Sequence, residues 1–200
     1  SRGEYLNGLL LAEYLGYPFV DAAEVIRFNQ DGAYDPAETM SLLRTRLGED
    51  KRAVIPGFYG ADEDGQIVTF SRGGSDITGA IVARAAKADL YENWTDVSGF
   101  LRADPRIVED AAPIEVVTYK ELRELSYMGA SVLHEEAIFP VREKGIPIQI
   151  RNTNAEADRG TLIVADESRL DFAGITGIAG MRDFTVITLD KTLMDDEKGF

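Results

Sequence analysis

Residues 69–86, TFSRGGSDITGAIVARAA, join an apolar strand to a helix through a short glycine-rich loop. From position 77 onward, apolar residues recur at helical spacing, which predicts a helix that starts near Ser75. Gly73 and Gly74 allow a tight turn or a close approach of the backbone to a ligand. Ser75 or Asp76 is suited to cap the helix. The fold prediction starts from this strand–loop–helix unit, because strand and helix patterns continue to alternate in the same way along the chain.

Helical and strand patterns alternate as far as residue 165. Such alternation predicts an α/β fold with a mainly parallel sheet covered on both faces. Ligands in these folds gather at the loops beyond the carboxyl ends of the strands. The spacing predicts helices at 4–16, 36–48, 75–88, 118–129 and 131–145, the last interrupted at Pro140, and strands at 18–20, 52–58, 67–70, 88–94, 146–152 and 161–164.

The composition is that of a globular protein with an acidic surface. Lys and Arg total 21 against 35 Asp and Glu, which gives a net charge of −14. This charge repels nucleic acid and anionic membranes, so neither is expected as a partner. There is no apolar run of about 18 residues and no signal peptide pattern, and the absence of cysteine excludes disulfides and thiolate metal sites. Together these features favour a cytoplasmic location.

The loop at 70–76, FSRGGSD, carries two opposite charges. Arg72 is suited to a bidentate pair with a carboxylate, and Asp76 can accept a hydrogen bond from an ammonium group. Together they would hold the two ends of an amino acid. The loop matches neither G-x-x-x-x-G-K-[ST] nor G-x-G-x-x-G, so the usual phosphate-binding patterns are absent from it. A plain strand-to-helix turn is the competing interpretation.

Other polar clusters carry weaker signals. The stretch 94–106, WTDVSGFLRADPR, offers a threonine and an aspartate at a strand end and arginines suited to phosphate, although turns are often rich in such residues. The one histidine, His134, is predicted to have a structural role. The acidic turn at 62–65 lacks the closing Glu of a calcium loop, and no metal-ligating residues are predicted.

A set of short motifs, taken in order, resembles the aspartate kinases of the amino acid kinase family over nearly the whole chain. Glutamate, carbamate and uridylate kinases share that fold but are not expected to combine RGGSD, WTDV and GA-x-VLH. The motifs are SRGE (1–4), PGFYG (56–60), FSRGGSD (70–76), WTDVSGF (94–100), ADPR (103–106), GASVLH (129–134) and GTLIV (160–164).

The resemblance implies a three-layer α/β/α sandwich that transfers the γ-phosphate of ATP, with Mg²⁺, to the side-chain carboxylate of L-aspartate. This is the first step of lysine, threonine and methionine synthesis. Residues 1–165 would be the larger, C-terminal part of the catalytic domain, 166–173 a linker, and 174–200 the start of an ACT-like α+β regulatory domain. The full-length protein is expected to form a homodimer.

By motif position, the resemblance also assigns roles to individual residues. No residue is assigned as a general base. The acceptor site would comprise Glu4, Arg72 and Asp76, with Gly73, Gly74 and Ser75 shaping the loop. The nucleotide site would comprise Thr95, Asp96, Arg106 as the neutraliser of phosphate charge, and Ser131.

Two positions depart from the family pattern. Leu101 stands where a tyrosine is usual, and Ser131 where a lysine usually contacts the nucleotide. The family's N-terminal strand and Lys-x-Gly-Gly phosphate loop would precede Ser1, so residues 1–200 alone are expected to be inactive. The alternatives are a non-catalytic regulatory or scaffold module of the same fold, and a kinase for another amino acid such as glutamate.

Overall fold

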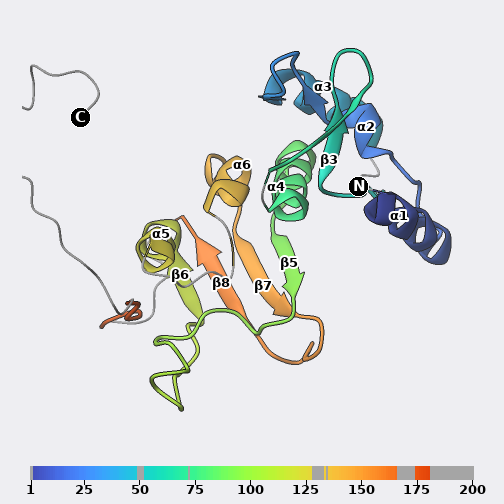
Figure 1. Cartoon of the computed structure of the whole chain (residues 1–200). Helices are drawn as coiled ribbons and strands as arrows, with labels where there is room; N and C mark the ends of the chain where they lie inside the picture. Colours follow the sequence, from blue (N-terminus) through green and yellow to red (C-terminus); the bar gives the residue numbers. More distant parts are fainter. Residues whose placement is uncertain are drawn as a thin grey trace, which may run out of the picture.

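Helices and strands alternate along the chain in the computed structural model, which describes residues 2–48, 52–71, 73–127, 133, 135–165 and 174–180 (Figure 1). The helices are α1 (Arg2–Leu15), α2 (Ala22–Val25), α3 (Pro36–Leu47), α4 (Gly74–Ala86), α5 (Tyr119–Tyr127), the 3-10 helix η1 (Glu135–Ile138) and α6 (Phe139–Arg142). The strands are β1 (Arg27–Phe28), β2 (Tyr34–Asp35), β3 (Tyr59–Ala61), β4 (Ile67–Thr69), β5 (Tyr91–Thr95), β6 (Val116–Thr118), β7 (Ile148–Asn152) and β8 (Thr161–Val164).

The strands form two four-stranded sheets, in the orders β2-β1-β3-β4 and β5-β7-β8-β6. Among the described strands, three neighbouring pairs are parallel (β1–β3, β5–β7, β6–β8) and three are antiparallel (β1–β2, β3–β4, β7–β8). The antiparallel pairs join strands that follow each other in the chain through short connections, which a parallel pair does not permit. The α/β class is therefore confirmed, but the sheets are mixed rather than mainly parallel.

Helix α4 belongs to two hydrophobic cores. Its Ala80 and Ala83 pack with the buried strand residues of β7 and β8, whereas Ile81 and Ala85 pack with the core around α2, α3 and β3. Because apolar residues cover more than one face of α4, the helix is buried from two sides. This position fixes the N-terminal end of α4, which carries the candidate acceptor loop.

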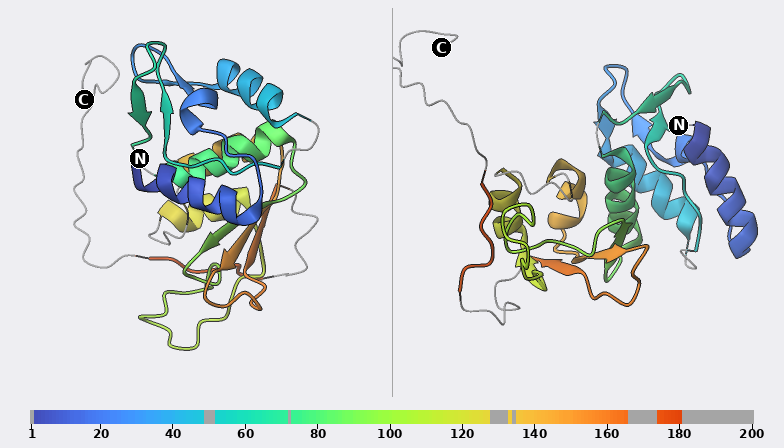
Figure 2. Two further views of the ribbon diagram at one scale, coloured as in Figure 1. Left: turned by 90° about the vertical axis from the view of Figure 1, so that its right-hand side faces the viewer. Right: turned by 60° about the horizontal axis from the view of Figure 1, so that its bottom comes forward.

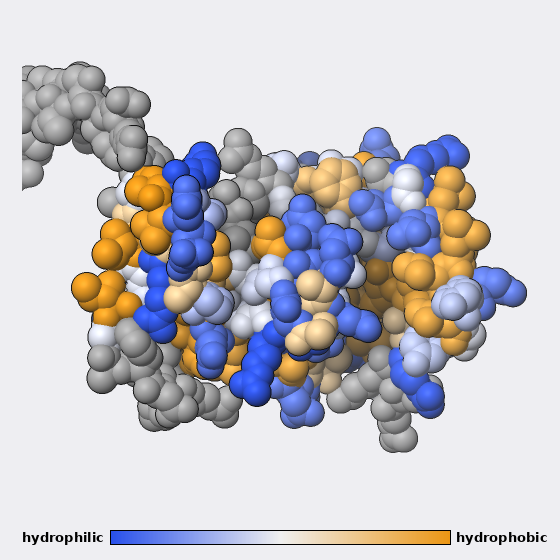
Figure 3. Space-filling view, turned by 90° about the horizontal axis from the view of Figure 1, so that it is seen from below, coloured by the Kyte–Doolittle hydropathy of each residue, from blue (hydrophilic) through white to orange (hydrophobic). Residues whose placement is uncertain are grey.

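One helical layer covers the sheet β5-β7-β8-β6. Helices α4, α5 and α6 lie over the same face (Figure 1; Figure 2, right). On the other face Trp94 is 45% exposed, and the Arg151 guanidinium lies 5.1 Å from the centre of its ring. Seen from below, the molecule mixes hydrophobic and hydrophilic residues (Figure 3). A three-layer α/β/α sandwich needs helices on both faces of the sheet. The part of the chain that the structure describes supplies helices on one face of this sheet only.

Two of the predicted strands are reduced to a single bridge. The stretches 18–20 and 52–58 meet only at Phe19 and Val54, which form an isolated parallel bridge. Pro56 has no backbone N–H to extend the pairing. Conversely, the sequence pattern did not predict the short strands β1, β2 and β6, and β3 lies directly after the predicted strand 52–58 rather than within it.

The helical stretch around Pro140 is divided into η1 and α6, so the break predicted there lies one to two residues before the proline. Pro140 occupies the first turn of α6, directly after η1. Proline is well tolerated at that position because the N–H it lacks would have no partner inside the helix. The other predicted helices appear near their expected bounds, and α3 begins at Pro36 and ends before Gly48 as predicted.

The stretch 174–180 lies against the loop after β5 and against α5. The Ile178 N–H donates to the Arg102 carbonyl oxygen over 2.7 Å, and the Thr176 hydroxyl donates to Glu121 Oε1. Glu121 also forms a capping box with Thr118, whose N–H donates to Oε2 over 2.9 Å, at the start of α5. The predicted linker at 166–173 and residues 181–200 lie outside the described residues.

This contact is expected to be sensitive to pH. Burial alone would raise the pKa of Glu121, but the hydrogen bonds from Thr176 and Thr118 outweigh burial and hold that pKa below its ordinary value. A lowered pKa in the folded state stabilises the contact above the ordinary glutamate pKa of about 4.3, and the stabilisation is lost as pH falls through the lowered value. Hydrogen exchange should therefore show less protection of 174–180 in acid, after correction for intrinsic rates.

The matched variants are Glu121→Gln and Glu124→Gln, both on α5. Glu121→Gln should reduce protection of 174–180 at neutral pH, because a neutral amide accepts the same hydrogen bonds more weakly. Glu124 is exposed and pairs with Arg123 on the same helix, so its variant should leave that segment unchanged. Equal protection in the wild type and in Glu121→Gln would contradict the role given to Glu121.

No helix in the described ranges is both long enough and apolar enough to cross a membrane.

Candidate functional site

The loop between β4 and α4 makes its turn at Gly73. This residue has φ +54°, in the left-handed region, and forms the N-cap of α4 without a side-chain hydrogen bond. The helix consequently starts at Gly74, and Ser75 and Asp76 lie inside its first turn. The prediction that Ser75 or Asp76 caps the helix is therefore wrong. The Asp76 carboxylate instead lies near the positive end of the helix dipole, which favours a negative charge there.

Gly74 allows the loop at 57–58 to pack closely on the start of α4. A Cβ at Gly74 would lie 2.7 Å from Phe58 Cδ2 and 3.0 Å from Phe58 Cα, and one at Gly57 would lie 3.0 Å from Ser75 Cα. The Phe58 N–H donates to the Thr78 hydroxyl oxygen over 3.1 Å. The glycines thus permit a close backbone approach, as predicted, but the neighbour is another loop of the protein.

Phe58 itself has φ +82°, which is rare for a residue with a bulky side chain. Backbone strain of this kind persists only where the surrounding packing enforces it, and it concentrates at functional sites. The PGFYG motif therefore packs against the N-terminal end of α4, with backbone strain at Phe58.

Asp76 is held from β5 by two side chains. Asn93 Nδ2 donates to Asp76 Oδ1 over 2.9 Å and to the Tyr91 hydroxyl oxygen over 3.1 Å, and the Tyr91 hydroxyl donates to the Asp76 carbonyl oxygen over 3.3 Å. Asn93 is only 8% exposed. Neither residue was predicted from the sequence. The available signal was an amide at an inward-facing position of a strand whose alternate residues, Glu92 and Trp94, face solvent.

Thr95 and Asp96 lie at the carboxyl end of the same strand. The Thr95 hydroxyl donates to Asp96 Oδ1 over 3.2 Å, while the Thr95 carbonyl oxygen accepts from Thr153. Thr95 follows Asn93 by two residues, a rise of about 7 Å along a strand. Strand β5 therefore links the Asp76 side of the site to the predicted nucleotide pair.

The loop after β5 is fixed by Thr161. Gly99 has φ +103°, and a Cβ there would lie 2.3 Å from Thr161 Oγ1. The Thr161 hydroxyl oxygen accepts from the Phe100 N–H over 2.9 Å. Leu101, where the family usually has tyrosine, forms an isolated antiparallel bridge with Pro113 and is 41% exposed.

Arg106 is exposed and pairs with its neighbour Asp104. Its Nε and Nη2 atoms donate to the two carboxylate oxygens over distances of 2.7 to 3.1 Å. The structure thus places the Arg106 guanidinium in a local pair with Asp104 within the ADPR turn, rather than against Thr95 or Asp96. Its role toward phosphate stays a prediction.

Glu4 lies in the first turn of α1 and is exposed. Gly8, one turn later on the same face, packs against Phe19 and Pro56: a Cβ there would lie 3.1 Å from Phe19 Cε2 and 3.3 Å from Pro56 Cβ. Pro56 precedes the Gly57 that contacts Ser75. Helix α1 therefore packs against the loop at 56–58, which borders the site, and Glu4 lies on the face of α1 that makes this contact.

Three residues singled out by the sequence, Arg72, Ser131 and His134, lie outside the described residues. Of the predicted acceptor set, the structure brings together Gly73, Gly74, Ser75 and Asp76. Thr95 and Asp96 lie at the end of the strand that contacts Asp76.

Within the described ranges, no three His, Asp or Glu side chains gather in a cluster suited to a metal ion. Magnesium is usually held by one or two carboxylates together with the phosphates of its nucleotide, so a dedicated protein cluster is not required for Mg²⁺–ATP.

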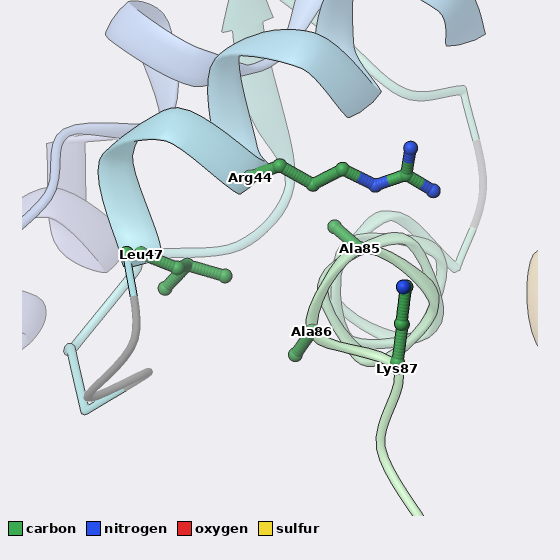
Figure 4. Close-up of a pocket in the computed structure, with 6 residues that line it drawn as sticks. Arg44, Leu47, Ala85, Ala86 and Lys87 are labelled. Atoms are coloured by element: carbon green, nitrogen blue, oxygen red, sulfur yellow. The ribbon is translucent and has the colours of Figure 1, made fainter.

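A cavity of about 210 Å³ lies at the opposite end of α4, lined by Arg44, Leu47, Gly48, Ala85, Ala86 and Lys87. The side chains of Arg44 and Lys87 extend beside Ala85 there (Figure 4). Cations at helix C-termini are favoured by the helix dipole, which accounts for both charges. Helix α4 has 13 residues, about 20 Å of helix, so this cavity is remote from Asp76.

The chain is also similar to known proteins in sequence and in fold. Residues 1–152 match the model of the amino acid kinase family. The chain is 41% identical over 209 aligned positions to aspartokinase 3 of Bacillus subtilis, covering 100% of this chain and 46% of that protein.

Two solved structures are also similar. An aspartate kinase of Clostridium acetobutylicum has a TM-score of 0.82 and 57% identity, covering 90% of this chain and 41% of the other. An aspartokinase III of E. coli in complex with aspartate and ADP has a TM-score of 0.75 and 30% identity, covering 84% and 40%. The chain thus spans about half the length of the relatives it matches or less. The resemblance to aspartate kinases drawn from the motifs is confirmed.

Proposed function

Because the chain belongs to the amino acid kinase family, we propose that the full-length protein containing it transfers the γ-phosphate of ATP to the side-chain carboxylate of L-aspartate. The product, 4-phospho-L-aspartate, feeds lysine, threonine and methionine synthesis. The E. coli relative bound aspartate and ADP, which supports this choice of acceptor and donor. A homodimer is the expected assembly.

The observation that carries the proposal is the placement of Asp76. Its half-buried carboxylate lies in the first turn of α4, four residues after Arg72. A carboxylate binds the ammonium group of an amino acid, and an arginine binds a carboxylate. A site for phosphate alone would not need the carboxylate. Asp76 and Glu4 are assigned to the polar groups of the acceptor, and Arg72 to one of its carboxylates.

The nucleotide is assigned to the carboxyl end of β5. Thr95 and Asp96 would bind it, and Arg106 would leave its pair with Asp104 to offset phosphate charge. Since Asn93 on the same strand contacts Asp76, the two substrates would meet across this strand end.

The chemistry needs positioning more than proton transfer. The attacking carboxylate is already ionised at neutral pH, so no general base is required. One of its oxygens forms a bond to the γ-phosphorus while the bond from that phosphorus to the bridging oxygen breaks, and ADP leaves. The protein's part is to align the two substrates and to offset negative charge. Mg²⁺ would enter with the phosphates of ATP and neutralise part of their charge.

The test is trapping of the acyl phosphate. Full-length protein with ATP, magnesium and L-aspartate should form a product that hydroxylamine converts to the hydroxamate, whereas residues 1–200 alone should form none. Turnover by the isolated chain would refute its expected inactivity. Full-length protein that neither binds nor phosphorylates aspartate would support the non-catalytic module instead, and preference for glutamate would make it a kinase for another amino acid.

A further inference from the structure

We propose that Asn93 is a positioning residue for the acceptor, which holds the Asp76 carboxylate in the orientation that receives the amino acid. The proposal rests on the function proposed above and adds a residue that the family motifs do not contain. Asn93 itself is 8% exposed and would act through Asp76 rather than touch the substrate.

The hydrogen bonds around Asn93 define its orientation. The amide group has two N–H donors, and Asn93 uses them on Asp76 Oδ1 at 2.9 Å and on the Tyr91 hydroxyl oxygen at 3.1 Å. An ionised carboxylate only accepts hydrogen bonds, so reversing the amide would place oxygen against oxygen. The carboxylate therefore fixes which end of the amide faces it, and the amide in turn fixes the carboxylate.

Tyr91 completes the arrangement from the other side. Burial raises the pKa of Tyr91 to about 12, so the hydroxyl keeps its proton at neutral pH. That proton is donated to the Asp76 carbonyl oxygen, while the hydroxyl oxygen accepts from Asn93. Both the backbone and the side chain of Asp76 are thus held by one strand.

A position in the first turn of α4 would not by itself fix the carboxylate. The Asp76 side chain is half-buried, and its carboxylate accepts a hydrogen bond from Asn93 on β5. With Oδ1 engaged by Asn93, Oδ2 accepts no hydrogen bond from another described residue and can receive a ligand at the N-terminal end of α4. A buried Asn side chain that faces an apolar layer destabilises the fold unless its amide donors form hydrogen bonds. Here both donors of Asn93 are bonded, to Asp76 and to Tyr91, at the candidate site.

The experiment compares Asn93→Leu with wild type in the full-length protein. Leucine keeps the branched shape and the number of side-chain heavy atoms and removes both donors. We expect KM for L-aspartate to rise about ten-fold, KM for ATP to change by less than about two-fold, and calorimetry to show a matching loss of aspartate affinity. Asn93→Asp should weaken aspartate binding more than Asn93→Leu does, because it places a second carboxylate against that of Asp76. A merely structural role would not separate the two substrates.

Thr39→Val is the matched control. Thr39 is also buried and accepts from the Arg27 N–H over 2.9 Å, but it lies on α3, whose Leu43 belongs to the other core. This variant should lower the melting temperature without changing the ratio of the two KM values. If Asn93→Leu behaves like Thr39→Val, the positioning role is overturned.

The design also separates this proposal from the proposed function. Wild-type protein that neither binds nor phosphorylates aspartate overturns the function, and this inference with it. Wild-type protein that binds aspartate, together with an Asn93→Leu variant that binds it equally well, overturns the inference alone.

Discussion

Replacing Asp76 with alanine is expected to raise the KM of the full-length protein for L-aspartate by about ten- to hundred-fold, while KM for ATP changes by less than about two-fold. The loss is that of a hydrogen bond to a charged group, about 1.5–3 kcal/mol, and tenfold corresponds to about 1.4 kcal/mol. The variant also leaves the amide of buried Asn93 without its carboxylate partner. Initial rates with each substrate varied in turn measure the split.

Asp96→Ala is the reciprocal control for this measurement. Asp96 is exposed at the end of β5, beside Thr95, and is assigned to the nucleotide. Its removal should raise KM for ATP more than KM for aspartate. Arg72→Ala, chosen from the sequence, should follow the Asp76 pattern. Equal effects of Asp76→Ala on both substrates would remove Asp76 from the acceptor site.

The second large effect is expected at Gly160, which precedes β8. Gly160 has φ +69°, and a Cβ there would lie 1.8 Å from the Ile150 carbonyl oxygen on β7. No side-chain rotation relieves a clash with the backbone, so the antiparallel pair β7–β8 has to separate. Gly160→Ala should therefore destabilise the protein by more than about 3 kcal/mol, in the range of severe core damage. Thermal unfolding and the yield of folded protein measure it.

Gly65→Ala separates conformational strain from the clash. Gly65 has a similar backbone, φ +78°, but no atom lies within 4 Å of a Cβ placed there. Its replacement should cost only the strain of a left-handed residue, about 1–2 kcal/mol. Similar losses at both glycines would show that β7 and β8 are not packed as described.

The fold was predictable where its signals are local. Helix α4 follows from apolar spacing within 69–86, and α3 from Pro36 and Gly48 at its ends. Strand pairing depends on contacts between distant segments, so the mixed sheets were not visible in the alternation. The two-residue strands β1 and β2 are too short to show a period, and the burial of α4 in two cores depends on partners that local spacing does not identify.

The candidate site was predictable in part for the same reason. Asp76, Thr95 and Asp96 belong to motifs that can be read in short stretches. The N-cap was misplaced because Gly73 takes the left-handed conformation and starts the helix one residue early. Asn93 was missed because its importance comes from a hydrogen bond to a residue 17 positions away.

The most direct test of the account is the choice between L-aspartate and succinate as acceptor for the full-length protein. Succinate keeps both carboxylates of aspartate and lacks only the ammonium group assigned to Asp76. If the loop at the mouth of α4 binds the acceptor amino acid, kcat/KM measured with hydroxylamine trapping should favour aspartate by at least about ten-fold, the effect of one charged hydrogen bond. Equal use of the two acids would contradict the assignment of this loop to the amino acid.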